Sequence, residues 1–338
     1  LLEKDPYRIE SYAELYRIFH ERQERDKAFC AAMALEFLRA ESQQQAEFLV
    51  QGRQFTSGEA LGVIIPEAER EELLIHPAEK GLLRDILMLL EPAMYHMEEA
   101  NLDPYDLPSC RVAGVASSIY HLMESTAYYL GVELFKLYIS QKQPDQLAVE
   151  NTRPPTIIIG GSLAYASEGI KRFIAGCVVG RIGNGHVVYS QKHYAWLQTM
   201  VEAACHLFNP EIAVYNASAA QVEAIGLELN RHLSPTTRRD LEARAAEYAR
   251  LETKPDYQEF QRAMQYSDDR MGLVMAGELR SALESVLHLD HGQPFRAAMR
   301  SDEIIRQLSG ERRAAELFRF CVSEDFFRLR RVVRQNLE

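Results

Sequence analysis

Histidine and cysteine side chains are the clearest candidates for chemistry in this sequence. His288 and His291 lie three residues apart, a spacing that can bring two imidazoles to a metal on one face of a helix. Gly292 and a proline follow directly, so the pattern favours the end of a helix, where histidine also suits the helix dipole. Cys177 lies four residues before Arg181, whose charge would lower the pKa of a nearby thiol. No histidine is placed by the sequence to serve that thiol, so a buried structural cysteine is the favoured interpretation.

Two glycine-rich stretches resemble known catalytic and nucleotide-binding motifs but do not match them. Gly160-Gly161-Ser162 is not a nucleophile elbow, because Ala164 stands where the motif needs glycine. The glycines at 180, 183 and 185 end a helical pattern, whereas a dinucleotide-binding loop opens one. Neither stretch predicts a catalytic serine or a nucleotide site.

The elements around Cys177 form a strand, a turn and a long helix. Thr156–Ile159 is a short apolar run typical of a buried strand, and glycines follow it. Ser167 suits the N-cap of a helix that continues to about residue 183, where Asn184-Gly185 ends it. Small residues within this helix, Gly176 and Gly180, predict close contact with a second helix.

Residues 155–276 resemble the catalytic core of the HtpX-like and CAAX-prenyl-protease-like zinc metallopeptidases. In that family a strand, a small turn and a capped helix lead to His-Glu-x-x-His, and a later helix carries Glu-x-x-Ala-Asp-Arg-x-Gly. Here Gly176-Cys177-Val178-Val179-Gly180-Arg181 stands at the first motif, with Asn184-Gly185-His186 after it. Gln265 to Gly272 stands at the second motif and keeps Asp269, Arg270 and the glycine. The resemblance implies an α+β fold with metallopeptidase-like core helices.

The resemblance also implies that the metal site is vestigial. Cys177 and Arg181 replace the two histidines, Val178 replaces the glutamate that acts as base, and Gln265 replaces the third ligand. A permanent cation repels a metal ion, and valine cannot accept a proton. We therefore expect no metal, no cofactor and no peptide hydrolysis by this route. We also expect an ion pair between Arg181 and Asp269.

Composition narrows the remaining classes of function. The 338 residues carry a net charge of −11, which argues against general nucleic-acid binding. No run of eighteen apolar residues exists, so we expect no membrane insertion. Five widely spread cysteines without a Cys-x-x-Cys pair are typical of a reducing compartment, so a cytoplasmic location is expected.

The remaining pattern predicts a predominantly helical α+β protein with a small β-sheet. Residues 1–51 resemble one tetratricopeptide-like hairpin, although a generic helical hairpin explains the pattern equally well. Either residues 42–51 cap this hairpin, or earlier repeats precede residue 1. Residues 52–338 then form the metallopeptidase-like domain with a helical C-terminal tail. The four phenylalanines of that tail need a partner surface, within the fold or on another chain: Phe318, Phe320, Phe326 and Phe327.

These features favour a pseudoenzyme that works as a scaffold or adaptor in a larger protein assembly. Tetratricopeptide-like helices bind other proteins, and by analogy with the family Thr156–Ile159 or its neighbouring strand would pair with a partner's peptide strand. Two alternatives stay open. One is a hydrolase with an unrecognised site, with Cys177 as its nucleophile. The other is a plain structural subunit whose aromatic tail docks on a larger machine.

Overall fold

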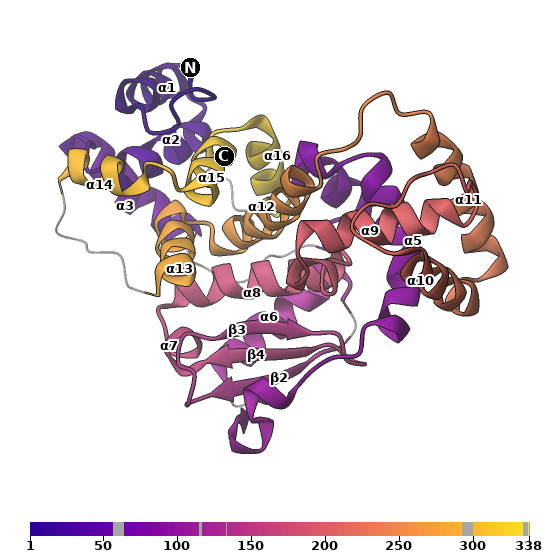
Figure 1. Cartoon of the computed structure of the whole chain (residues 1–338). Helices are drawn as coiled ribbons and strands as arrows, with labels where there is room; N and C mark the ends of the chain where they lie inside the picture. Colours follow the sequence, from indigo (N-terminus) through magenta and orange to yellow (C-terminus); the bar gives the residue numbers. More distant parts are fainter. Residues whose placement is uncertain (57–63, 115–116, 133, 293–299, 334–336, 338) are drawn as a thin grey trace.

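The computed structural model shows a mostly helical α+β protein with a four-stranded sheet, which confirms the expected fold class at this level (Figure 1). It describes residues 1–56, 64–114, 117–132, 134–292, 300–333 and 337. The N-terminal and C-terminal helices lie together in one part of the molecule, while the sheet and the helices α5, α9, α10 and α11 lie in others (Figure 1).

The helices occur in three stretches of the chain. Before the sheet they are α1 (Ile9–Glu21), α2 (Arg25–Phe37), α3 (Gln43–Thr56), α4 (Glu67–Glu69), the π-turn η1 (Arg70–Leu74), the 3₁₀ turn η2 (Pro77–Glu79), α5 (Leu82–Met97), and the 3₁₀ turns η3 (Asp103–Tyr105) and η4 (Leu107–Ser109). Among and just after the strands come α6 (Ser118–Leu130), α7 (Gly161–Ala164) and α8 (Glu168–Gly183). The rest are η5 (Tyr189–Gln191), α9 (Tyr194–His206), α10 (Ala219–His232), α11 (Pro235–Ala249), α12 (Tyr257–Ala276), α13 (Leu279–His291), α14 (Ser301–Leu308), α15 (Arg312–Cys321) and α16 (Glu324–Val332).

The sheet has the order β1-β2-β4-β3, with β1 (Arg111–Val112), β2 (Lys136–Ser140), β3 (Leu147–Glu150) and β4 (Thr156–Gly160). β4 is parallel to β2, with Ile157 opposite Leu137, and antiparallel to β3, with Ile157 opposite Val149. Every residue of β4 is buried. The strand predicted at Thr156–Ile159 is confirmed, but the expectation that a partner's strand pairs with it is wrong. A strand on each side already takes the hydrogen bonds of β4, so the edge is its neighbour β3.

The N-terminal hairpin packs on the C-terminal tail. From Ala28 to Phe37 nearly every side chain of α2 is buried, because α1, α3, α13 and α15 surround it. Asp26 on α2 accepts hydrogen bonds of 2.8 and 3.0 Å from Arg330 on α16, and both side chains are buried. The rings of Tyr7 and Tyr12 lie 5.3 and 5.8 Å from that of Phe318 on α15.

All four tail phenylalanines are buried at 2% exposure or less, so the surface that they need lies within this fold. The boundary between residues 51 and 52 stays a prediction, since the hairpin and the tail share one hydrophobic cluster with the sheet.

A second hydrophobic cluster joins α5, α9 and α11 to the first half of α12. Its buried phenol pair links the two ends of a loop, with Tyr248 Oη and Tyr257 Oη 2.9 Å apart. The second half of α12 enters the other cluster through Met271, Leu273 and Val274. Helix α12 therefore connects the two cores. In the described part of the chain, no helix is long and apolar enough to cross a membrane.

Candidate functional site

Helices α8 and α12 cross at van der Waals contact because glycine lies at the crossing on both. A Cβ atom at Gly176 would lie 2.7 Å from the carbonyl oxygen of Met271. A Cβ atom at Gly272 would lie 2.5 Å from Sγ of Cys177. Real Cβ atoms do not approach other atoms so closely, so these two positions admit only hydrogen. The close contact confirms what the small residues of the sequence predicted, and it brings the polar side chains of α12 against α8.

The crossing brings three of the five expected site positions into one set of polar contacts, Cys177 and Asp269 directly and Gln265 through Arg313, while Arg181 pairs separately with Asp268. Cys177 donates its thiol to Oδ1 of Asp269 at 3.8 Å, and Gln265 lies one turn before Asp269 on α12. Arg181 lies one turn after Cys177 on α8. Val178 instead points into the hydrophobic cluster and takes no part in the polar contacts.

The expected ion pair between Arg181 and Asp269 is wrong. Nε of Arg181 donates to Oδ2 of Asp268 at 3.0 Å, while both carboxylate oxygens of Asp269 accept from Arg313 on α15, at 2.8 and 2.7 Å. Successive residues on a helix point about 100° apart, so neighbouring aspartates face different partners. The sequence pattern indicated a cation for this part of α12 but assigned it to the wrong carboxylate.

The guanidinium of Arg313 lies among the positions that the resemblance assigns to the metal site. Besides Asp269 it pairs with Asp290 on α13. The amide of Gln265 lies beside it, and with its oxygen toward Arg313 it accepts from Nη1 at 3.3 Å and from Nε at 3.2 Å. Burial by itself would lower the pKa of Arg313, but the carboxylates of Asp269 and Asp290 raise it. A permanent positive charge is thus held there.

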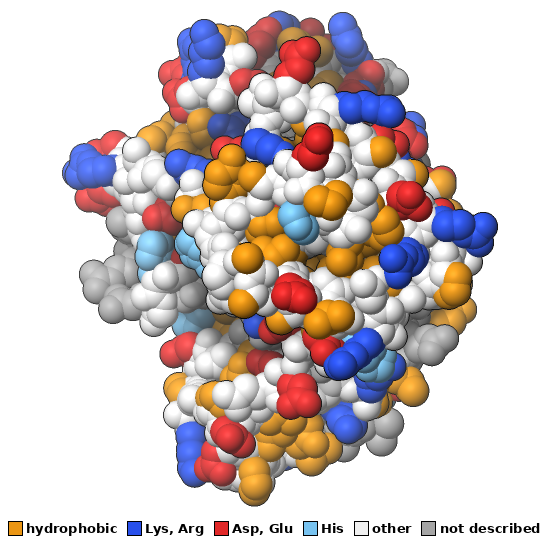
Figure 2. All heavy atoms as spheres, turned by 45° about the vertical axis from the view of Figure 1, so that its right-hand side comes forward, with side chains coloured by type: hydrophobic (Ala, Val, Ile, Leu, Met, Phe, Trp, Pro, Cys, Tyr) orange, Lys and Arg blue, Asp and Glu red, His pale blue; other side chains and the backbone are white. Residues whose placement is uncertain are grey.

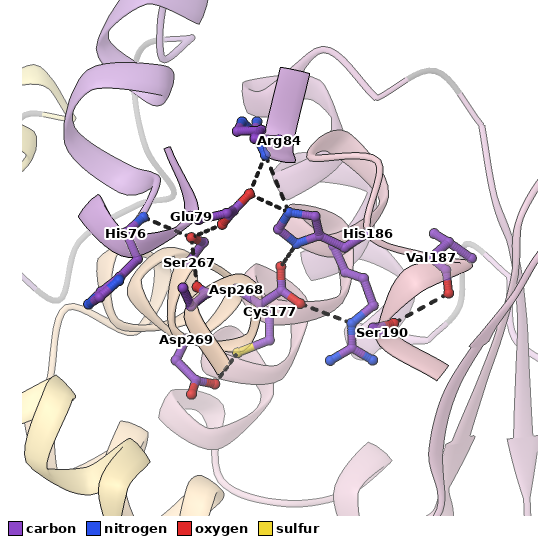
Figure 3. Close-up of polar contacts among 12 residues, drawn as sticks. His76, Glu79, Arg84, Cys177, His186, Val187, Ser190, Ser267, Asp268 and Asp269 are labelled. Carbon is purple, nitrogen blue, oxygen red and sulfur yellow. Dashed lines mark hydrogen bonds and ion pairs between the residues drawn. The ribbon is translucent and has the colours of Figure 1, made fainter. Parts of the chain in front are cut away.

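The imidazole of His186 is buried between the carboxylates of Asp268 and Glu79 (Figure 3). Nδ1 of His186 lies 2.9 Å from Oδ1 of Asp268, and Nε2 lies 2.8 Å from Oε1 of Glu79. A carboxylate can only accept, so both ring nitrogens carry a proton and His186 is an imidazolium. Burial would lower the pKa of His186, but Glu79 and Asp268 raise it to about 9.

Further charges extend this contact into an alternating chain. Arg84 on α5 pairs with Glu79 and, at 2.8 Å, with Glu71. In the order Glu71, Arg84, Glu79, His186, Asp268, Arg181 each charge pairs with one of opposite sign, and Nη1 of Arg84 also lies 3.4 Å from Nε2 of His186. Burial would raise the pKa of Glu79, but His186 and Arg84 lower it to about 2. The four inner charges, of Arg84, Glu79, His186 and Asp268, are buried and sum to zero, whereas any one of them alone would be costly, and the two end groups are partly exposed.

Two further residues of α12, Ser267 and Arg270, form hydrogen bonds with the segment at η2 and with the C-terminal tail. The hydroxyl of Ser267 donates to Glu79, and it accepts from the backbone N–H of His76 at 2.8 Å. Arg270 donates to Glu316 on α15 at 2.6 Å. Residues 265–270 of α12 thus contact η2, α8 and α15 in turn.

This geometry opposes Cys177 as a nucleophile. The expectation was that Arg181 lowers the pKa of the thiol, but Arg181 is engaged by Asp268. Burial, together with the charge of Asp269, raises the pKa of Cys177 well above its ordinary value. The thiol is therefore protonated and donates to Asp269.

The other histidines singled out from the sequence lie elsewhere. Helix α13 ends at His291 with Gly292 in the left-handed conformation, as predicted. His288 contacts Asp145 at 3.0 Å and His291 contacts Glu311 at 3.1 Å, so the two imidazoles have different partners. His193 caps α9 by accepting from the N–H of Ala195. Among the described residues, no group of three or more histidine, cysteine, aspartate and glutamate side chains could hold a metal ion.

Sequence reasoning missed most of the charged chain. Arg84 and Glu79 lie about a hundred residues before His186, and nothing in their local pattern predicts burial. Arg313 lies in the C-terminal tail, where the sequence pattern did not mark it as a site residue. One signal in the sequence pointed to His186 as a site residue: it ends the stretch that resembles the family's first motif.

Comparisons with known protein families, curated proteins and solved structures found no match to this chain. The resemblance to the metallopeptidases therefore rests on the two motif-like stretches and their order.

Proposed function

We propose that this chain is a non-catalytic scaffold or adaptor whose α8–α12 pair keeps the frame of a zinc metallopeptidase without its chemistry. One observation carries the proposal. The guanidinium of Arg313 contacts Asp269 and Gln265, and Asp269 also accepts a hydrogen bond from the thiol of Cys177. Gln265 and Cys177 stand where the resemblance expects metal ligands. A cation that cannot lose its proton takes the place where a metal's charge would be.

A second cation strengthens this proposal. Arg181, at the position of the family's second histidine, neutralises Asp268, the residue before Asp269 on α12. Asp268 and Asp269, the carboxylates nearest these positions, are thus already paired with arginine or with His186. Binding of Zn²⁺ would require breaking buried ion pairs, which typically costs about 3–5 kcal/mol each.

Metal analysis combined with restoration of the motifs tests the proposal. Purified protein incubated with Zn²⁺ and desalted is expected to hold no stoichiometric zinc, and one zinc per chain would contradict it. The variant Cys177→His, Val178→Glu, Arg181→His, Gln265→Glu, Arg313→Ala rebuilds the family's ligand set. It is expected to bind one zinc, whereas a folded variant that binds none would contradict the metallopeptidase-like frame.

The role in protein binding is supported by an apolar hollow on the far side of the molecule from the hairpin. A hollow of about 660 Å³ between α5, α9 and α10 is lined by Met97, Trp196, Met200 and Ile225. Figure 2 shows this side of the molecule, where hydrophobic side chains gather around a hollow. Exposed apolar surface of this kind is typical of protein interaction sites.

Affinity capture with matched surface variants tests this role. Ile225→Asp changes the hollow, and Val50→Asp on α3 changes an exposed apolar side chain away from it. Partners captured by the wild type and by Val50→Asp, but not by Ile225→Asp, are the expected result. Equal capture by all three proteins would remove the hollow from the proposal.

A cytoplasmic location belongs to the same proposal. It is supported by the five cysteines, all of which are free thiols. Redox labelling of thiols in intact cells measures their oxidation state. We expect the five cysteines to be found reduced.

A further inference from the structure

A small cavity lies outside the charged network, at one end of the parallel strand pair. It measures about 250 Å³ and lies between α7, the first turns of α8 and α13. Helix α7 begins directly at the carboxyl end of β4, and the loop after β2 reaches α13 through Asp145. The carboxyl ends of parallel strands are where open α/β sheets commonly bind ligands.

The wall of this cavity divides into an apolar and a polar part. Leu163, Ala166 and Ile170 supply the apolar part. The polar part consists of Ser162 and Ser285 and, one helical turn apart on α13, Glu284 and His288. A site with apolar walls and a few polar groups on one side is the usual form of a small-molecule pocket.

Among the described residues, Arg280 and Arg39 are the cations whose charge acts on the carboxylate of Glu284, and neither forms an ion pair with it. Within the described part of the chain it makes no hydrogen bond and no ion pair, although the residue is partly buried. Arg280, the cation that acts on it most strongly, forms an ion pair with Glu36 at 3.8 Å. Burial raises the pKa of Glu284, which means that the ionised carboxylate is poorly stabilised where it stands.

His288 also lines this cavity. Its Nε2 lies 3.0 Å from Oδ1 of Asp145, and since a carboxylate only accepts, Nε2 carries the proton. In neutral His288 the remaining nitrogen, Nδ1, is therefore an acceptor. With Glu284 and the Ser162 oxygen, the cavity offers acceptors of hydrogen bonds and one negative charge.

We propose that this cavity binds a small aliphatic primary amine, with the ammonium group on Glu284 and the carbon chain against Leu163, Ala166 and Ile170. An ammonium ion brings three donors and the charge that Glu284 lacks. An anion would be repelled by the same carboxylate. The volume corresponds to about eight water molecules at ~30 Å³ each, which limits the ligand to a short chain.

Three probes of matched length test the proposal: n-pentylamine, 1-pentanol and pentanoate, each titrated into the whole chain by calorimetry and by thermal melting. Pentylamine is expected to raise the melting temperature and to bind at least ten-fold more tightly than pentanol, and pentanoate is expected not to bind. Equal affinity of amine and alcohol, or preference for pentanoate, would overturn the proposal.

Two variants locate the binding. Glu284→Gln keeps the shape of the side chain and is expected to remove the preference for the amine, while Ile170→Trp fills the cavity and is expected to remove binding of both amine and alcohol. Glu242→Gln, an exposed carboxylate on α11, is the control and should bind like the wild type. Unchanged amine binding by folded Glu284→Gln would overturn the proposal, and that variant decides the matter if Ile170→Trp does not fold. These outcomes are independent of the zinc measurements above.

Discussion

At the scale of single residues, the centre of this molecule is a set of buried charges that satisfy one another. His186 is the clearest case, because both ring nitrogens face carboxylates and no water or solvent-exposed group is needed to explain its charge. Such groups contribute to stability only as a set, since removal of one leaves its neighbour buried without a partner.

Charge reversal at Arg181 is expected to destabilise the fold. Arg181→Glu places a carboxylate against Asp268, whose side chain is 2% exposed, so a loss of about 3–5 kcal/mol in the free energy of unfolding is expected. Arg172→Glu on the same helix breaks only a partly exposed contact with Glu168 and should cost less than about 1 kcal/mol. Chemical denaturation of both variants checks this, and a wild-type melting temperature for Arg181→Glu would contradict it.

Stability should fall on the alkaline side because of His186. Its pKa is raised from 6.5 in the unfolded chain to about 9 in the fold, so the stabilisation from its charge is fully present below pH 6.5. That stabilisation is lost as the pH rises through about 9. Unfolding measured from pH 6 to pH 10 should show this decrease in the wild type and a much smaller one in His186→Gln. Parallel curves for the two proteins would rule out His186 as the cause.

Glu79 should act in the opposite direction at low pH. Its pKa is lowered from 4.5 to about 2, so the stabilisation from its charge is present above pH 4.5 and is lost as the pH falls toward 2. Glu79→Gln is expected to be less stable than the wild type at pH 7, with the difference shrinking between pH 4.5 and pH 2. The measurement is urea denaturation across that range.

At the scale of elements, α12 organises the molecule because elements from distant parts of the chain pack against it. Its residues contact η2, α8 and α15, and its ends lie in two different hydrophobic clusters. The sequence indicated a helix at Gln265 to Gly272, the small residues of α8 and the strand β4. It did not indicate β1, which has only two residues, or the position of β4 between two other strands. Short apolar runs show that a strand is buried but not which strands flank it.

The crossing of α8 and α12 gives a prediction at this scale. Gly176→Ala gains up to about 1 kcal/mol in helix propensity, yet its Cβ would lie 2.7 Å from the Met271 carbonyl oxygen, which cannot move without shifting α12. We therefore expect a net loss of about 1–3 kcal/mol. Gly114→Ala, where a Cβ meets nothing within 4 Å, is the control. An increase in melting temperature for Gly176→Ala would show that the helices do not cross so closely.

At the scale of the whole molecule, the first and last helices of the chain depend on each other. Arg330 is fully buried, and its guanidinium lies between Asp26 and the rings of Phe29 and Phe326. The tail thus supplies one wall of the core of the hairpin, and the hairpin covers the tail's aromatic residues. If the hairpin serves as an adaptor, it does so while packed against the tail and not as a separate module.

Removal of the buried carboxylate tests this dependence. Asp26→Ala leaves the Arg330 charge without its carboxylate and is expected to cost about 3–5 kcal/mol, while Asp26→Leu with Arg330→Met should be close to the wild type. Limited proteolysis of Asp26→Ala is expected to cut in the hairpin and in the tail at the same rate. Cleavage in the tail alone, with an intact hairpin, would show that the two are independent.

The sequence by itself determined the class of the fold, the main strands, the long helices and the glycines that let α8 and α12 meet. It did so because propensity, capping and hydrophobic period are local properties of a few neighbouring residues. Only the tertiary structure decided the partners of the charges: Arg181 with Asp268, Arg313 with Asp269, and Glu79 with His186. A charged residue has the same local pattern whether it is exposed or buried. Its pairing depends on side chains that lie up to a hundred or more residues away, and burial makes that pairing obligatory.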